Sequence, residues 1–103
     1  METEIMQTEI IEHGNEAEVL IKGRLDTLTS KVARDLFTDV AGRFDSVTLN
    51  MQDLVYCSSA GIRAIRHIYK LMRAKGGKLN TINVQNTVMQ VFEITGVTAL
   101  LSV

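Results

Sequence analysis

Two short segments near the start of the chain have the hydrophobic pattern of β-strands. Residues 5–11 are rich in strand-forming side chains, and residues 16–23 alternate between apolar and charged positions, as a half-buried strand does. Residues 13–15 between them read His-Gly-Asn, and glycine and asparagine accept the positive φ angles of a tight turn. The pattern therefore predicts an opening β-hairpin whose second strand ends at Gly23.

Three later segments carry apolar residues at the 3.6-residue spacing of an amphipathic helix. Their predicted inner faces are Leu28, Val32, Leu36 or Phe37 and Val40 in the first, Ile62, Ile65, Ile68 or Tyr69 and Met72 in the second, and Val88, Val91 and Phe92 in the third. Thr27 or Thr29 can cap the first helix, and Asn86 or Thr87 the third. A glycine follows the end of each predicted helix, at Gly42, Gly76-Gly77 and Gly96.

Two further strands complete the pattern. Residues 47–56 predict a buried central strand with a kink or bulge near Asp53, and residues 78–84 predict another strand. Residues 98–103 form an apolar tail that would add one helical turn against the core. The order β-β-α-β-α-β-α predicts an α/β layer fold whose sheet is largely parallel after the hairpin.

Length, composition and charge narrow the class of protein. The chain of 103 residues is 46% hydrophobic and 22% charged, which suits one folded domain. Its 11 basic and 12 acidic side chains give a net charge of −1 without a basic block, which argues against a nucleic-acid partner. No apolar run approaches the ~20 residues that span a bilayer, and no secretory signal is visible. The single cysteine, Cys57, cannot form an internal disulfide, so we expect a cytoplasmic protein.

The stretch "YCSSAGIR", residues 56–63, lies where a predicted strand turns into a helix. Ligands of α/β sheets bind beyond the carboxyl ends of strands, and a helix start there offers free N–H groups and a partial positive charge. A phosphate on Ser58 or Ser59 would be favoured in this place. Either serine can instead simply cap the helix, worth ~1 kcal/mol, and the local pattern favours capping. Gly61 in the first helical turn suggests close backbone approach to a neighbouring element or a ligand.

Asp26 is the second candidate for a functional role. It follows a predicted strand and precedes a helix, so it should share a rim with Ser58 and Ser59 if the two strands are neighbours. A plain capping role explains it equally well. Arg63 and Arg66 on the outer face of the second predicted helix would suit an acidic partner, although a solvated basic face is the default interpretation.

Catalytic, metal and cofactor sites find little support in the sequence. The nucleophile motif G-x-S-x-G is absent, and neither His13 nor His67 is placed to act as a base for a serine. Cys57 ends an apolar run, where a buried and inert thiol is expected. No ligand cluster at metal-binding spacing and no phosphate-binding glycine loop occurs. We therefore predict a protein that is not an enzyme and binds no metal and no cofactor.

Four segments together resemble the STAS domain family, most closely its bacterial anti-sigma factor antagonists. They are "GRLDTLTS", "VYCSSAGIRAI", "AKGGKL" and "VMQVFEITGVTALL", and their order and spacing cover nearly the whole chain. The resemblance implies one STAS domain over residues 1–103, with a four- to five-stranded mixed, largely parallel sheet and helices packed on it. It also implies partner switching: the unphosphorylated antagonist binds an anti-sigma factor that is a serine kinase, phosphorylation at the start of the central helix releases it, and a PP2C-type phosphatase restores it.

The resemblance assigns roles to particular residues. Family members often read D-S-S-G or D-S-A-G where this chain reads Ser58-Ser59-Ala60-Gly61, so Ser59 takes the place of the phosphoacceptor and Ser58 is the reserve. Ser58 stands where the family has aspartate, which removes an acidic group from the rim. Asp26 matches the aspartate of the neighbouring loop. The implied partner-binding residues are Asp26, Thr27, Ser58, Ser59, Gly61, Ile62 and Arg63.

Three other functions remain open from the sequence. The domain would have the same fold as a regulatory subunit of a transporter or a signalling enzyme, without sigma-factor control. A small enzyme would use Ser59 or Cys57 as a nucleophile, and it would need a base within hydrogen-bond reach. A passive interaction module would not be phosphorylated at all.

Overall fold

The computed structural model of the chain describes residues 6–99, so Ile5 and most of the predicted C-terminal turn lie outside the described part. Its elements, in order, are β1 (Gln7–His13), β2 (Glu16–Leu25), α1 (Ser30–Arg43), β3 (Ser46–Asn50), β4 (Leu54–Cys57), α2 (Ser59–Lys75), β5 (Lys78–Ile82), α3 (Asn86–Thr95) and the 3₁₀ helix η1 (Val97–Ala99). The predicted order of strands and helices is therefore confirmed within this range, except that two strands, β3 and β4, stand where one was predicted.

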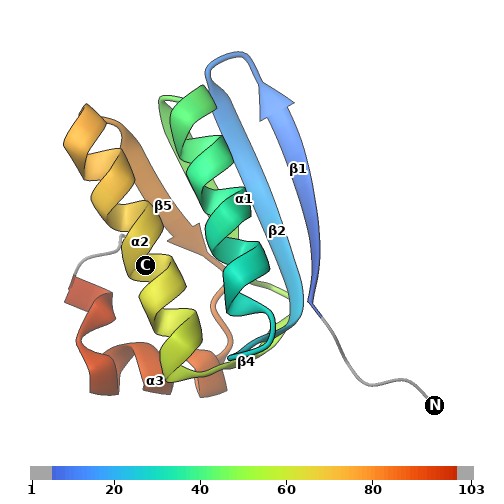
Figure 1. Ribbon diagram of the computed structural model, residues 1–103. Helices are drawn as coiled ribbons and strands as arrows, with labels where there is room; N and C mark the ends of the chain where they lie inside the picture. Colours follow the sequence, from blue (N-terminus) through green and yellow to red (C-terminus); the bar gives the residue numbers. More distant parts are fainter. Residues whose placement is uncertain (1–5, 100–103) are drawn as a thin grey trace.

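The strands form one mixed sheet, which lies behind α1 and α2 in Figure 1. β1 and β2 make the predicted antiparallel hairpin, while β3 pairs in parallel with β2 and β5 pairs in parallel with β3. β4 also pairs in parallel with β2, beyond β3 along the same strand. The predicted α/β class with a largely parallel sheet is confirmed.

The prediction of one central strand over residues 47–56 is wrong, because the chain forms two strands there. A turn separates β3 from β4, and both follow the same edge of β2. Between the paired residues Leu20 and Asn50 and the paired residues Leu25 and Cys57, β2 advances five residues and its partner seven. The two extra residues leave the ladder, so a bulge predicted near Asp53 becomes a full break in the strand.

β2 does not end at Gly23, as its pattern predicted, but continues to Leu25. Gly23 has a φ of 90°, and the pairing register shifts between it and Arg24. The amide of Gly23 donates to the carbonyl of Asp53 at 2.9 Å, which joins the irregular point of β2 to the break between β3 and β4. Glycine permits this left-handed turn inside a strand, so β2 reaches the rim where the candidate residues lie.

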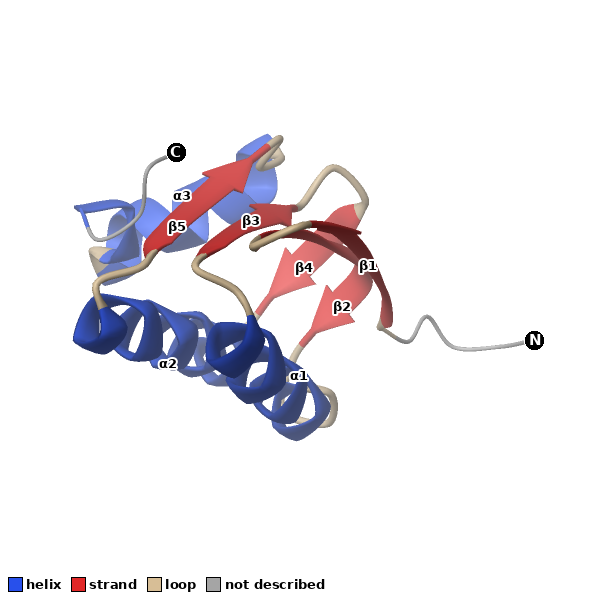
Figure 2. Cartoon of the chain, turned by 90° about the horizontal axis from the view of Figure 1, so that it is seen from above, coloured by secondary structure: helices blue, strands red, loops and turns tan. Residues whose placement is uncertain are grey.

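Helices α1 and α2 lie side by side on one face of the sheet, and α3 packs against β4 (Figure 2). The largest fully buried side chains come from all of these layers and include Ile21, Leu49, Phe37, Ile65, Met72 and Phe92. At ~25 cal/mol per Å² of apolar surface, such side chains supply most of the stability of the domain. The core therefore holds both helices against the sheet and fixes where their N-termini lie.

The predicted inner face of the first helix is only half right. Phe37 and Val40 are fully buried, but Val32 is 60% exposed and Leu28, which precedes the helix, is 88% exposed. The buried face is completed instead by Ala33 and Ala41, because small side chains let α1 pack closely on its neighbours. Two apolar residues are consequently left on the surface near the start of α1.

The ends of the other helices follow the prediction more closely. α2 ends before Gly76 and α3 before Gly96, as expected. Two details differ: Gly42 lies inside α1, and Asn86 is the first residue of α3 after Gln85, which makes no side-chain capping bond. These differences are of one or two residues, the usual scale of error at a helix end.

Gly61 is a position of the site with no room for a side chain. A Cβ atom there would lie 2.6 Å from the carbonyl oxygen of Leu25 and 2.9 Å from Cys57 Sγ. We expect Gly61→Ala to lower the free energy of unfolding by about 1–3 kcal/mol, the usual cost of overpacking. Urea denaturation followed by circular dichroism measures the change.

Gly42→Ala is the matched control, because it lies in a helix with nothing within 4 Å of a new Cβ. The greater helix propensity of alanine should leave this variant as stable as the parent or stabilise it by up to about 1 kcal/mol. Equal stabilities of the two variants would contradict the close approach at Gly61.

Candidate functional site

The carboxyl ends of β2 and β4 meet at one rim of the sheet. Leu25 and Cys57 are paired residues of these two strands, and the amide of Ser58 donates to the carbonyl of Leu25 at 2.9 Å. Asp26 and Ser58 are the residues that follow the paired strand ends. The expectation that Asp26 and the serines share a rim is confirmed.

Ser58 is the N-cap of α2. Its backbone is extended, with φ −93° and ψ 179°, and its hydroxyl oxygen accepts from the amide of Gly61 at 3.3 Å. Its carbonyl accepts the first helical bond, from the amide of Ile62 at 2.9 Å. The capping role that the local pattern favoured is therefore real for Ser58.

Ser59 is different, because it is the first residue of α2 and is exposed. Among residues 6–99, no side-chain hydrogen bond involves its hydroxyl. The amides of the first helical turn lack carbonyl partners inside the helix, and that of Gly61 already pairs with Ser58. No acidic residue occurs in this first turn, so no carboxylate of α2 itself offsets the partial positive charge at the start of this 17-residue helix.

Asp26 organises the neighbouring loop. Its Oδ1 accepts from the amides of Leu28 at 3.0 Å and Thr29 at 3.1 Å, while its own amide donates to the Thr29 hydroxyl at 2.9 Å. Arg24 Nε lies 3.5 Å from Oδ2. Partial desolvation raises the pKa of Asp26, but the hydrogen bonds from Thr29, Leu28 and Arg24 outweigh it, so the pKa lies below its ordinary value. Asp26 is therefore ionised at neutral pH and closes the turn that precedes α1.

The seven partner-binding residues implied by the resemblance differ in exposure, and Asp26 and Ser58 are half-buried. Thr27, Ser59 and Arg63 are exposed on the rim. Gly61 and Ile62 are buried: Ile62 is 4% exposed and belongs to the core, and Gly61 faces Leu25. Both lie on the face of α2 whose residues are buried, which puts them beneath the surface.

Leu28 is a rim residue that the sequence analysis placed in the core. It lies in the loop held by Asp26, and its 88% exposure makes it the most exposed large apolar side chain among the described residues. Tyr56, which is 41% exposed, is another large apolar side chain at this rim. The guanidinium of Arg24 lies 4.1 Å from the centre of its ring. For Leu28, the only sequence signal of a place on the rim was its position two residues after Asp26.

The geometry of the described residues does not support the alternatives that need a nucleophile. Burial raises the pKa of the Cys57 thiol to about 12, and its Sγ lies 3.7 Å from the Ser58 carbonyl. His67 Nε2 is 2.8 Å from Thr38 Oγ1, and His13 ends β1 beside the start of β2, at the opposite rim. Within residues 6–99, no group of three or more possible metal ligands occurs, and no helix is long and apolar enough to cross a membrane.

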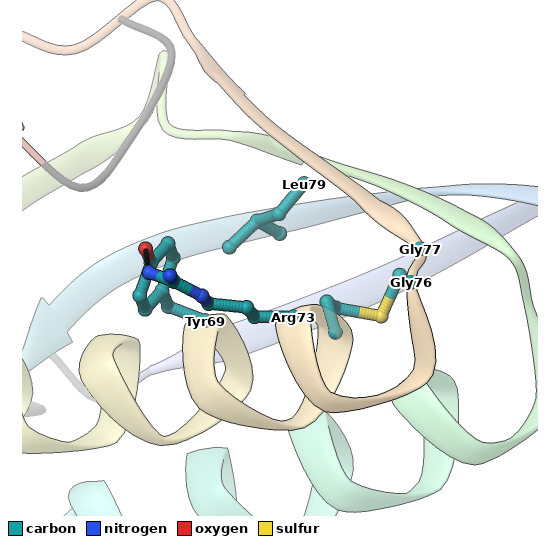
Figure 3. Close-up of a pocket in the computed structure, with 6 residues that line it drawn as sticks. Tyr69, Arg73, Gly76, Gly77 and Leu79 are labelled. Carbon is teal, nitrogen blue, oxygen red and sulfur yellow. Dashed lines mark hydrogen bonds between the residues drawn. The ribbon is translucent and has the colours of Figure 1, made fainter.

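A hollow of about 320 Å³ lies at the other end of α2 and is shown in Figure 3. Arg73 and Tyr69 line one side, where Arg73 Nη1 donates to the Tyr69 hydroxyl at 2.9 Å, and Leu79 of β5 faces them. It lies beside Gly76, about 25 Å from Ser59 at 1.5 Å per helical residue. It is therefore separate from the rim and contributes nothing to it.

Comparisons with known proteins agree with this architecture. The family model described as STAS domain matches residues 7–103. The chain is 21% identical to the anti-sigma-B factor antagonist of Bacillus subtilis (strain 168), over 95% of this chain and 90% of that protein. It is 27% identical to the anti-sigma F factor antagonist of Paenibacillus polymyxa, over 88% and 80%. The solved structure of the anti-sigma factor antagonist SpoIIAA in its unphosphorylated form has a TM-score of 0.79 at 18% identity, over 94% and 85%.

The thiol of Cys57 provides a direct test of the nucleophile alternative. With a pKa of about 12, the group carries almost no thiolate at pH 8, and burial also blocks access. We expect a thiol reagent such as dithionitrobenzoate to react with the native protein only as fast as it unfolds. The same reagent should react at once in guanidinium chloride. Rapid stoichiometric reaction of the native protein would revive a catalytic role for Cys57.

Proposed function

The chain belongs to the STAS domain family, and we propose that it is an anti-sigma factor antagonist that works by partner switching. In this proposal the unphosphorylated protein binds an anti-sigma factor that is also a serine kinase, and so releases a sigma factor. The kinase then uses ATP to phosphorylate Ser59, which ends the complex. A PP2C-type phosphatase removes the phosphate. The names of its relatives, which are anti-sigma factor antagonists, support the general role.

The free hydroxyl of Ser59 is the observation that carries the assignment of the phosphoacceptor. Ser58 and Ser59 are adjacent, but the hydroxyl of Ser58 caps α2 through the amide of Gly61. Phosphorylation of Ser58 would change a group already bound within the fold. Phosphorylation of Ser59 would change an exposed group on the first helical turn, which a kinase can reach without unfolding the helix.

A phosphate on Ser59 would separate binding from folding. It adds a charge of about −1.5 to −2, which the N-terminus of a helix stabilises. The fold should therefore survive. An interface that covers the rim must bury the exposed Leu28 and remove water from Ser59, and a phosphate there is costly to desolvate. The modified protein should keep its structure and lose its partner.

The serine in place of the usual aspartate affects the same charge balance. An aspartate at position 58 would put a carboxylate next to the phosphate, whereas Ser58 is neutral. Like charges at this distance disfavour each other. We therefore propose that the substitution eases phosphorylation of Ser59 electrostatically, while the hydroxyl of Ser58 keeps the capping function that an aspartate would also supply.

We predict that a cognate anti-sigma factor kinase with ATP adds one phosphate to the parent protein and none to Ser59→Ala. Intact-mass spectrometry and peptide mapping give the number and the position. Ser59→Ala should bind the kinase whether or not ATP is present, and Ser59→Asp should bind at least tenfold more weakly with an unchanged circular dichroism spectrum.

Two serine variants serve as controls. Ser58→Ala should remain a substrate but lose about 1 kcal/mol of stability with its cap. Ser30→Ala, at the start of α1, should behave as the parent in both respects. Full phosphorylation of Ser59→Ala would transfer the assignment to Ser58, and a partner that is neither kinase nor anti-sigma factor in pull-downs from the native cell would refute the proposed pathway.

A further inference from the structure

A second surface of the molecule has a chemistry that the proposed switch does not use. A hollow of about 330 Å³ lies along the outer side of α1 and α2, the two helices that run side by side in Figure 1. Every residue that lines it carries a basic side chain: Arg34 from α1, and Arg63, Arg66, His67 and Lys70 from α2. We refer to these five residues as the basic groove.

The charges of the basic groove are not neutralised within residues 6–99. The ion pairs of this range use Arg24, Lys31, Arg43 and Lys75, and none uses a residue of the groove. Arg66 is held in place because its Nη2 donates to the carbonyl of Thr95 at 2.6 Å, which is a neutral acceptor. Four permanent cations therefore line one hollow without a carboxylate, although the whole chain has a net charge of −1.

His67 links the two helices that form the basic groove. The Thr38 hydroxyl donates to the Arg34 carbonyl at 2.8 Å, so its oxygen is left to accept from His67 Nε2–H at 2.8 Å. This bond ties α2 to α1 across the floor of the groove. Desolvation, followed by the charges of Arg34 and Lys70, lowers the pKa of His67.

We propose that the basic groove is a docking site for a short acidic segment, rich in aspartate and glutamate, of a protein partner. Arg63 to Lys70 spans about 10 Å along α2, the length of about three residues of extended chain. A nucleic acid fits less well, because no Phe, Tyr or Trp side chain lines the groove for base stacking and the chain as a whole is slightly acidic. Arginine forks and a lysine suit carboxylates that arrive one after another.

The basic groove is also connected to the rim through one face of α2. Arg63, Arg66 and Lys70 follow Ser59 by four, seven and eleven residues, so all four project from the same side of the helix. A negative charge at position 59 would pair with Arg63 four residues later, in the favourable orientation for such pairs. This charge would compete with an acidic segment for the mouth of the groove. The coupling needs only the geometry and does not require that a kinase modifies Ser59.

Fluorescence anisotropy with a labelled hexaglutamate peptide tests the docking site. We expect the parent protein to bind this peptide and to lose affinity for it as the salt concentration rises from about 0.05 M to about 0.5 M. It should not bind hexaglutamine, which carries no charge on its side chains. Arg63→Gln/Lys70→Gln should bind roughly three- to tenfold more weakly, as two partly exposed charge pairs are lost. Both side chains are exposed, so the thermal transition should not change.

The control is Lys31→Gln/Lys78→Gln, which changes the net charge equally at two exposed lysines outside the groove. It should bind the peptide as the parent does. Equal losses in the two double variants would overturn the proposal, because attraction would then be general. Tighter binding of a single-stranded oligonucleotide of equal charge, lost in Arg63→Gln/Lys70→Gln, would overturn it in favour of nucleic acid.

Ser59→Asp tests the coupling without any kinase. We expect it to weaken hexaglutamate binding about twofold, the effect of one helical charge pair formed with Arg63. Asn80→Asp adds the same charge at an exposed position of β5 and should have no effect. Equal affinities of Ser59→Asp and Asn80→Asp would refute the coupling and leave the docking site and the proposed phosphorylation to their own tests.

Discussion

The contact between the first turn of α2 and the end of β2 is the constraint on which the site depends. Gly61 lies so close to Leu25 that no side chain fits between them, and the amide of Ser58 donates to the Leu25 carbonyl. These contacts place the start of the helix directly beside the end of a neighbouring strand. The loop that contains Asp26 leaves the sheet at the same point. Any movement of α2 away from β2 would therefore separate the serines from Asp26.

The same contact gives the two adjacent serines different chemistry. Ser58 must turn the chain from strand to helix, so its hydroxyl is drawn back to the amide of Gly61. The hydroxyl of Ser59, the next residue, makes no hydrogen bond within the described residues, and it lies at the positive end of a long helix. Capping and modification are thus not rival explanations of this stretch. Each belongs to one serine, which is why the role of Ser59 can be proposed without weakening the role of Ser58.

α2 also concentrates electrostatic features that the overall composition hides. A net charge of −1 suggests a surface with no preference. In the folded chain, the helix has an uncompensated N-terminus at one end and a row of cations along its outer side. The acidic residues are paired or lie on other elements, such as Asp39 and Glu12 around Arg43. Separation of charge between surfaces, and not net charge, decides which partners the rim and the basic groove can attract.

Sequence alone determined most of the order of elements, the opening hairpin and the largely parallel sheet, and it placed Asp26 and the serines each at the end of a strand. Local patterns suffice for these, because alternation, helical spacing and the glycines after helix ends act within a few residues. The break in the central strand was predicted only as a kink or bulge near Asp53. The family resemblance added the role of Ser59, which no local pattern separates from that of Ser58.

Only the tertiary structure decided which side of each helix is buried and which charges meet. Leu28 and Val32 continue the apolar spacing of α1, yet they are exposed, because Ala33 and Ala41 allow the helix to pack closely on the opposite side. The basic groove combines Arg34 with residues some thirty positions later, and nothing in the sequence indicates that α1 and α2 are neighbours. Contacts between distant segments depend on the packing of the whole core, which is the reason why local patterns cannot supply them.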